Sequence, residues 1–562
     1  MNKAARTFVF QARHKDKTRS SFLSGWTLSI VLIALLIAAP ILLVLASLFF
    51  PNPEIWQHLS STVLPRYIQN SGWLMLGVGS LSLFIGVTTA WLVSMCQFPG
   101  KRLFEWALFL PMAIPAYILA YTYTDFLQVS GPIQSFIRTT FELRPRDYFF
   151  PEIRSLGGAI VLLSLALYPY IYLLARAAFL EQSCSMLEAS QCLRANAWSS
   201  FLRVSLPLAR PAIAAGVALV LMETLSDFGT VDYFGIQTFT TGIYRTWFGL
   251  GEKLAAVQLS AWLLVFVLVL LALERASRSQ LKQSSKERFR SLLVYPLTGW
   301  RAGFAMFACL LPVTLGFILP AYLLTQKALS NANRSFNPEF WSFARNSLSL
   351  AVITAGLALV LALILAYGER IRPNWLNGLA VRIASMGYAV PGSVIAVSVL
   401  ISFGWLDGKL NLLTERFFGI STGLILSGTM VGLVFAYLVR FLTAAFNTLE
   451  SGLKTITPSM DEAARSLGKR SLARLFTIHI PLLRSSFLSA AIFVFVDTMK
   501  ELPATLIVRP FNLDTLAIRV YRLASDERLV EASGGALAIV VVGLLPVLLL
   551  SLAISKSRSR KL

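Results

Sequence analysis

Long apolar runs recur along the whole sequence and restrict the chain to folds that can sit in a lipid bilayer. About 20 apolar residues, each rising 1.5 Å, are needed for a helix to cross the hydrocarbon core. Of the 562 residues 56% are hydrophobic and 14% are charged, whereas soluble domains carry about 25% charged residues. We therefore expect an all-α membrane protein with about twelve transmembrane helices, at 25–49, 72–96, 103–127, 156–179, 207–231, 254–273, 302–325, 346–368, 380–404, 421–446, 482–507 and 534–554.

The basic residues gather in short clusters between these runs. The 50 Lys and Arg residues outnumber the 28 Asp and Glu residues, which gives a formal charge of +22. In a membrane protein such clusters set the orientation, because cytoplasmic segments are enriched in Lys and Arg. Basic tails at 1–24 and 556–562 and a basic linker at 275–300 predict cytoplasmic termini and a lipid environment, and no nucleic-acid partner.

The sequence repeats itself at an offset of about 274 residues. Glu188-Ala189 aligns with Glu462-Ala463, and the same register places Pro207 on Pro481. Each half holds six predicted spans, which defines a first lobe at 25–274 and a second lobe at 301–555. An even number of spans per half makes this a parallel duplication, with a possible path between the halves.

The repeated segment between the fourth and fifth spans of each half predicts a short helix–turn–helix on the cytoplasmic face. Ser185 and Ser459 each stand three residues before a glutamate, which is a capping-box pattern. Gly468 is suited to a left-handed helix stop. An ordinary loop is the alternative, but the occurrence of this segment twice in register favours a docking element.

The three histidines, His14, His58 and His479, are isolated in sequence, and we expect them at the surface or among headgroups.

This segment resembles the signature of permease subunits of binding-protein-dependent ABC importers. Glu462, Ala463, Gly468, Ile478 and Pro481 match it at the expected spacing, while Glu188, Ala189 and Arg194 form a looser first copy. The resemblance implies two tandem lobes of the type I, MetI-like fold. It also implies that each loop seats on one of two copies of a separate ATPase, which carries the ATP and magnesium. Arg194 enters a left-handed turn less easily than glycine, so the first loop is expected to turn differently.

A narrower resemblance covers nearly the whole chain. The segments 222–231 and 497–506 are similar to those of fused two-lobe permeases of ferric-iron importers. This implies Fe³⁺ as the transported substrate, a periplasmic ferric-iron-binding protein as partner, and the bacterial inner membrane as location. Thiamine and phosphonate permeases are related, so they remain alternative assignments.

Four acids interrupt the fifth and eleventh spans at matched positions. Glu223 and Asp227 are four residues apart, as are Asp497 and Glu501, so each pair is expected to share one helix face. Each such group costs at least about 2.5–3.5 kcal/mol at a helix centre in a membrane. An oxygen-rich constriction suited to a hard cation would compensate for that cost. The structural alternative is that Lys500 neutralises one acid and others cap broken helix ends.

Other features complete the prediction. Pro115 and Pro391 are expected to interrupt the third and ninth spans.

Three residues are expected on the outer side as a docking site for the binding protein: Tyr244, Arg245 and Arg519. Anchoring at the membrane interface is the alternative. The chain has no GxxxxGK[ST] motif and no nucleophile–base set, so we expect neither an enzyme nor a bound cofactor. A secondary transporter or a channel would share the hydropathy profile.

Overall fold

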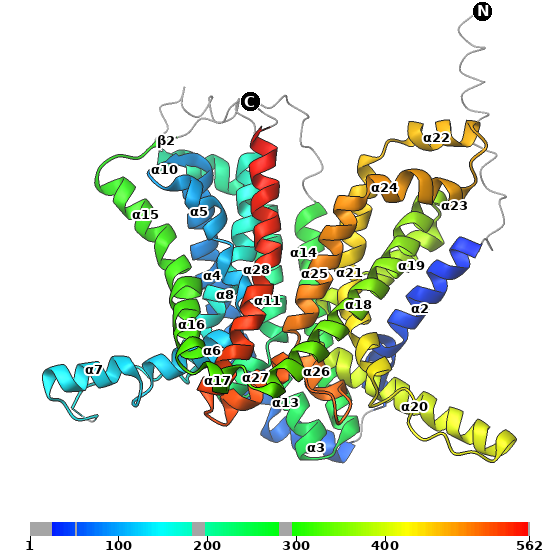
Figure 1. The fold of residues 1–562 in the computed structure, drawn as a ribbon, viewed down its shortest axis with the longest axis horizontal. Helices are drawn as coiled ribbons and strands as arrows, with labels where there is room; N and C mark the ends of the chain where they lie inside the picture. The colour runs from blue at the N-terminus through cyan, green and yellow to red at the C-terminus, as the bar shows by residue number, and fades with distance from the viewer. Residues whose placement is uncertain (1–24, 51–52, 146, 183–196, 280–294, 560–562) are drawn as a thin grey trace, which may run out of the picture.

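The computed structural model describes residues 25–50, 53–145, 147–182, 197–279 and 295–559, and it is built almost entirely of helices (Figure 1). Within these ranges ten helices are long and apolar enough to cross a membrane, or up to twelve if each of two bent pairs is one span. The predicted all-α membrane fold with about twelve spans is therefore confirmed.

The first half of the chain contributes the following elements: α2 (Gly25–Ala46), η1 (Ser47–Phe49), α3 (Pro53–Thr62), α4 (Leu64–Met95), β1 (Cys96–Gln97), α5 (Lys101–Ala107), η2 (Leu110–Ala113), α6 (Ala116–Leu127), α7 (Pro132–Phe141), α8 (Leu156–Leu180), α10 (Ala197–Ser200), η3 (Phe201–Ser205), α11 (Leu206–Ser226), α12 (Gly229–Tyr233), α13 (Phe239–Tyr244), η4 (Arg245–Gly249) and α14 (Lys253–Ser279).

The second half contributes a matching set: β2 (Tyr295–Pro296), α15 (Trp300–Val313), η5 (Thr314–Ile318), α16 (Leu319–Ser330), α17 (Ala332–Ser335), α18 (Pro338–Ile371), α19 (Trp375–Ala384), η6 (Gly387–Ala389), α20 (Gly392–Phe418), α21 (Met430–Thr455), α22 (Pro458–Ser466), α23 (Ser471–Arg474), η7 (Leu475–His479), α24 (Ile480–Leu482), α25 (Arg484–Lys500), α26 (Pro503–Val508), α27 (Leu516–Ser525) and α28 (Leu529–Ser559). The short strands β1 and β2 pair in parallel, with Cys96 opposite Tyr295.

The first helix of each half packs on the other half. The apolar helix α2 lies against α18, α19 and α20. In the opposite direction, α15 lies against α4 and α5, and α16 lies against α6, while α16 also packs on α28 of its own half. Figure 1 shows this exchange, with blue α2 beside the yellow-green helices and green α15 beside the blue ones. Because each half supplies part of the other's core, the two lobes interlock.

Prolines break two of the predicted spans, as the sequence indicates. Pro115 stands immediately before α6, and Pro391 stands immediately before α20, both in an extended backbone conformation. Proline has no N–H to continue a helix but fits well at a helix start. The pieces before and after Pro115 make an angle of 89°.

The acid-bearing spans are also broken, as the structural alternative from the sequence allowed. We expected continuous helices over 207–231 and 482–507, but α11 ends at Ser226 and α25 ends at Lys500. A short helix follows each break: α12 in the first half and α26 in the second.

The molecule has two ends that the helices connect (Figure 1). The helices α10 and α22, the beginning of α2 and the end of α28 lie at one end, which we call the α22 end. The helices α3, α13 and α27 lie at the other, which we call the α13 end. The second copy of the repeated segment forms α22, and α10, which follows the first copy in sequence, lies at the same end of the molecule.

Candidate functional site

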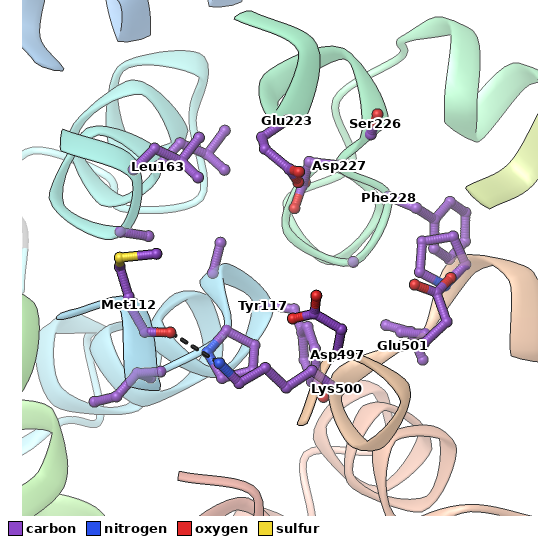
Figure 2. A pocket seen from close by; sticks show the side chains of 18 of the residues that line it. Met112, Tyr117, Leu163, Glu223, Ser226, Asp227, Phe228, Asp497, Lys500 and Glu501 are labelled. Carbon is purple, nitrogen blue, oxygen red and sulfur yellow. Dashed lines mark hydrogen bonds between the residues drawn. The ribbon is translucent and has the colours of Figure 1, made fainter. Parts of the chain in front are cut away.

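A cavity of about 190 Å³ lies where the two halves meet. Its lining comes from η2, α6, α8, α11 and α12 of the first half and from η6, α21, α25 and α26 of the second. All four predicted acids, Glu223, Asp227, Asp497 and Glu501, line this one cavity (Figure 2). The duplication thus brings together residues that are 270 or more positions apart in the chain.

Two of the acids cap helices, so they do not lie on a helix face as expected. Asp227 follows the last residue of α11 and accepts bonds from the N–H groups of Thr230 and Val231, both at 3.1 Å, and from Thr230 Oγ1 at 3.0 Å. Glu501 follows α25 and accepts a 2.8 Å bond from the N–H of Ala504. Each carboxylate therefore satisfies free amides at the start of the next short helix, α12 or α26.

Glu223 and Asp497 differ from these capping acids. They lie on α11 and α25, one turn before the breaks, and Figure 2 shows their carboxylates directed into the cavity. Among the residues that the structure describes, no hydrogen bond or ion pair to either side chain is recorded. Both carboxylates therefore border the open space of the cavity.

Two cations share the cavity with the four acids. Arg440, on α21, lies 3.1 Å from Glu501, with side chains 11% and 5% exposed. Lys500 Nζ donates a 2.9 Å bond to the carbonyl of Met112 in the other half, which Figure 2 shows as a dashed line. The sequence analysis missed Arg440, although a lone arginine inside a predicted span is a recognisable signal.

Both cations come from the second half of the chain. At the 274-residue offset, Arg440 corresponds to Ala166 and Lys500 corresponds to Ser226, and both of these line the same cavity. The acids therefore follow the duplication and the cations do not. Acidic groups exceed basic ones by two in this lining. The described residues contain no group of three or more His, Cys, Asp or Glu side chains placed to hold a metal ion.

The three residues predicted for docking lie toward the α13 end. Tyr244 ends α13, Arg245 follows it and is exposed, and Arg519 lies on α27. Arg519 pairs with Glu339 at 2.7 Å and lies over the ring of Phe343. The helices α13 and α27 lie at the end opposite α22. That this end is the outer one, and that it docks a partner, both stay predictions.

A junction between the halves closes the molecule near these residues. The hydroxyl of Tyr521 on α27 donates to Asp232 on α12, and Arg154 lies 3.8 Å from Glu527. Burial, and then the neighbouring Asp232 carboxylate, raise the pKa of Tyr521 above its ordinary value. Tyr521 therefore stays protonated and can donate this bond at neutral pH.

The second copy of the repeated segment forms α22 at the opposite end. Glu462 and Ala463 are exposed on it, and Gly468, with φ of 74°, provides the predicted left-handed stop. The capping-box prediction is wrong, because α22 begins at Pro458 and Ser459 lies inside it. Proline at the first helical position needs no hydrogen-bond acceptor for its nitrogen. The first copy, with Glu188, Ala189 and Arg194, lies outside the described residues.

His479 also differs from expectation. We predicted a surface position because no partner stands near it in sequence, but its side chain is 1% exposed and lies 3.1 Å from Asp461. The contact forms only when α22 folds back over η7, so no local pattern could indicate it.

Comparison with known proteins decides the family. The model of the family described as "Binding-protein-dependent transport system inner membrane component" matches twice, at residues 82–283 and 358–560. The chain belongs to this family. It is therefore a permease with two copies of the family domain and is a multi-pass membrane protein.

Relatives of this permease differ in the substrate that their names give. It is 27% identical over 542 residues to the "Fe(3+)-transport system permease protein FbpB 2" of Haemophilus influenzae, covering 93% of this chain and 97% of the relative. It is 25% identical over 574 residues to the "Ferric transport system permease protein FbpB" of Actinobacillus pleuropneumoniae, covering 96% of this chain and 79% of the relative. It is 31% identical over 166 residues to the "Molybdenum transport system permease protein ModB" of Escherichia coli, covering 29% of this chain and 69% of the relative. The similarity to the two ferric-named permeases spans both lobes.

Proposed function

We propose that this permease forms the path for ferric iron in an ATP-driven importer, with the cavity as part of that path. The observation that carries the proposal is the meeting of four carboxylates, two from each lobe, in a cavity between the lobes. Carboxylate oxygens suit hard cations such as Fe³⁺. The names of the relatives that cover nearly the whole chain support the same substrate. Thiamine and phosphonate, the alternatives from the sequence, find no support among these names.

In this proposal the α22 end faces the cytoplasm. The exposed Glu462 and Ala463, turned by Gly468, would seat on one ATPase subunit, and the segment with Glu188, Ala189 and Arg194 would seat on a second copy. The basic tails at 1–24 and 556–562 and the linker at 275–300 would share that side, consistent with their charge. ATP and magnesium would bind to the ATPases, and this chain would hold no cofactor.

The α13 end would then face the periplasm, across the bacterial inner membrane. A ferric-iron-binding protein would dock there on the surface that includes Tyr244, Arg245 and Arg519. The lobes 25–274 and 301–555 would alternate between exposing the cavity to that protein and to the cytoplasm, as closure of the ATPases moves α22 and its counterpart.

Uptake of labelled ferric iron tests the proposal directly. Vesicles would contain the chain, the ATPase and a loaded binding protein, with labelled thiamine as the substrate control. We expect ATP-dependent iron uptake that Glu223→Gln combined with Asp497→Asn lowers about 10-fold or more, because the cation loses its carboxylate partners. ATPase activity should remain.

The matched control is Asp526→Asn, which makes the same chemical change at an exposed position after α27. Uptake without ATP, uptake of thiamine in place of iron, or full iron uptake by the double variant would each contradict the proposal.

A further inference from the structure

The helix α22 has little apolar packing to hold it in place. Its nine residues include one buried side chain, Ala464, while Met460, Glu462, Ala463 and Arg465 are exposed. Helices this short are marginal by themselves in water. Another interaction must therefore fix the position of α22 on the second lobe.

That interaction centres on Asp461. Its Oδ2 accepts bonds from Arg370 Nε at 3.0 Å and Nη2 at 2.8 Å. Its Oδ1 lies 3.1 Å from His479 Nε2 and 3.6 Å from Arg474 Nη1. The side chain of Asp461 is 15% exposed. Those of Arg370, Arg474 and His479 are 19%, 7% and 1% exposed, respectively. Hydrogen bonds between ionised groups are about twice as strong as neutral ones, so this cluster is the main attachment of α22.

The partners of Asp461 reach two membrane helices. Arg370, near the end of α18, also donates to the carbonyls of Leu453 and Ile456, where α21 ends. Both carbonyls lie at the end of α21, where the last carbonyls of a helix have no i+4 amide to bind. Arg474 ends α23 and His479 ends η7, and His479 Nδ1 lies 3.2 Å from the carbonyl of Arg474. The helix α24 follows His479 directly, and α25 begins after a bend of 76°. One carboxylate on α22 is thus joined to the ends of both α21 and α25.

Those two helices lead to the cavity. The helix α21 carries Arg440, and α25 leads to Glu501, which pairs with Arg440 at 3.1 Å. We propose that Asp461 is the positioning residue that couples movement of α22 to both sides of the Arg440–Glu501 pair. This inference rests on the proposed function in one respect, namely that an ATPase moves α22. The attachment of α22 through Asp461 does not depend on it.

The sequence of the first lobe does not repeat these charged residues. At the 274-residue offset, Asp461, Arg474 and His479 correspond to Leu187, Ser200 and Ser205 in the sequence. None of these can carry the matching charge. The corresponding region of the first lobe instead contains an aromatic cluster, in which Trp91 contacts Phe179 and Phe201 at centroid distances of 5.7 and 4.7 Å. The charged residues of the Asp461 cluster are therefore particular to the second lobe at these matched sequence positions.

The test uses Asp461→Asn in the full chain, assembled with the ATPase in lipid nanodiscs. Amide hydrogen exchange over 459–467 should accelerate about 10-fold or more, because local opening of α22 no longer breaks charged bonds. Exchange in the middle of α18 and α21 should stay unchanged. In proteoliposomes with a loaded binding protein, iron taken up per ATP hydrolysed should fall while hydrolysis continues.

Two further variants keep the test decisive. Arg370→Lys keeps the positive charge beside Asp461 but loses the planar guanidinium that binds the carboxylate through two N–H groups. The faster exchange of α22 should therefore appear in this variant too, although the net charge of the cluster is unchanged. Asp526→Asn should change neither measurement. Unchanged exchange over 459–467 in both Asp461→Asn and Arg370→Lys would overturn the proposal, as would equal acceleration throughout α18 and α21. Because exchange needs no cargo, it decides whether Asp461 holds α22 in place even if no iron uptake is found. The coupling is decided by the iron taken up per ATP hydrolysed, which should stay at the wild-type value in Asp461→Asn if the proposal is wrong.

Discussion

At the scale of single residues, the four acids of the cavity divide into two kinds. Asp227 and Glu501 satisfy backbone amides, and Glu501 also neutralises Arg440, so both are part of the fold. Glu223 and Asp497 face the cavity from their helices. The sequence predicts all four positions through the repeat, but it cannot separate the two kinds. Their difference depends on where α11 and α25 end.

The pairing of Arg440 with Glu501 gives a prediction about stability. Glu501→Gln should destabilise the protein by about 3–5 kcal/mol, because it leaves a buried guanidinium without its partner. The double variant Arg440→Gln with Glu501→Gln should recover much of that loss. Thermal unfolding in detergent, followed by circular dichroism, measures both. Equal unfolding temperatures for the single and double variants would contradict this view of the pair. Glu223→Gln is the comparison variant and should unfold close to the wild type.

Residues with distant partners explain why sequence reasoning failed at particular points. His479 appears isolated in sequence, and its contacts with Asp461 and Tyr367 come from folding of the loop across 18 and 112 positions. Arg440 was overlooked because the surrounding apolar run dominates any average over a window. Its charge alone was a usable signal, since ionisable groups inside a membrane are rarely without a function.

At the scale of elements, the broken helices determine where the cavity forms. Hydropathy locates apolar runs well, because length and composition are all that it measures. It cannot show that a helix stops within a run, as α11 does at Ser226 and α25 does at Lys500. Pro503, at the first position of α26, marks the second break in the sequence. The first break has Gly229 in the corresponding region and no proline, so its signal is weaker.

A close backbone approach beside the cavity gives an element-scale prediction. A Cβ added to Gly387 in η6 would lie 1.7 Å from the carbonyl oxygen of Val439 in α21. Gly387→Ala should therefore push η6 and α21 apart, cost about 1–3 kcal/mol of stability, and displace the neighbouring Arg440. Thermal unfolding and iron uptake should both fall.

Gly404→Ala is the matched control for this prediction. Nothing lies within 4 Å of a Cβ at Gly404, which stands inside α20 with an ordinary backbone. Replacing a helical glycine by alanine there should stabilise by about 0.5–1 kcal/mol. A Gly387→Ala protein as stable as the Gly404→Ala protein would show that the approach of η6 to α21 is not tight.

At the scale of the whole molecule, the lobes are interlocked by exchange of their first helices. The repeat predicts two similar lobes, and the double family match confirms them. The exchange was not predicted, because hydropathy says which segments are helices and nothing about which helices pack together. The contacts of α2 with α19 and of α15 with α4 appear only in three dimensions.

This exchange predicts that the two halves assemble without a covalent link. Two fragments, 1–286 and 287–562, expressed together should co-purify through a tag on one of them, because each buries its first helix on the other. Deleting residues 1–50 from the first fragment removes α2 and should lower recovery of the partner several-fold, since apolar burial contributes roughly 25 cal/mol per Å². Recovery that does not depend on α2 would contradict the packing described above.

Two lobes encoded in one chain can differ in ways that identical subunits cannot. In a symmetric pair, every substitution appears on both sides of the axis, so a gain of one positive charge is always a gain of two. Here Arg440 and Lys500 face Ala166 and Ser226 across the same cavity. Fusion of the halves thus allows an electric field with a direction across the cavity, although both lobes contribute acids to it equally.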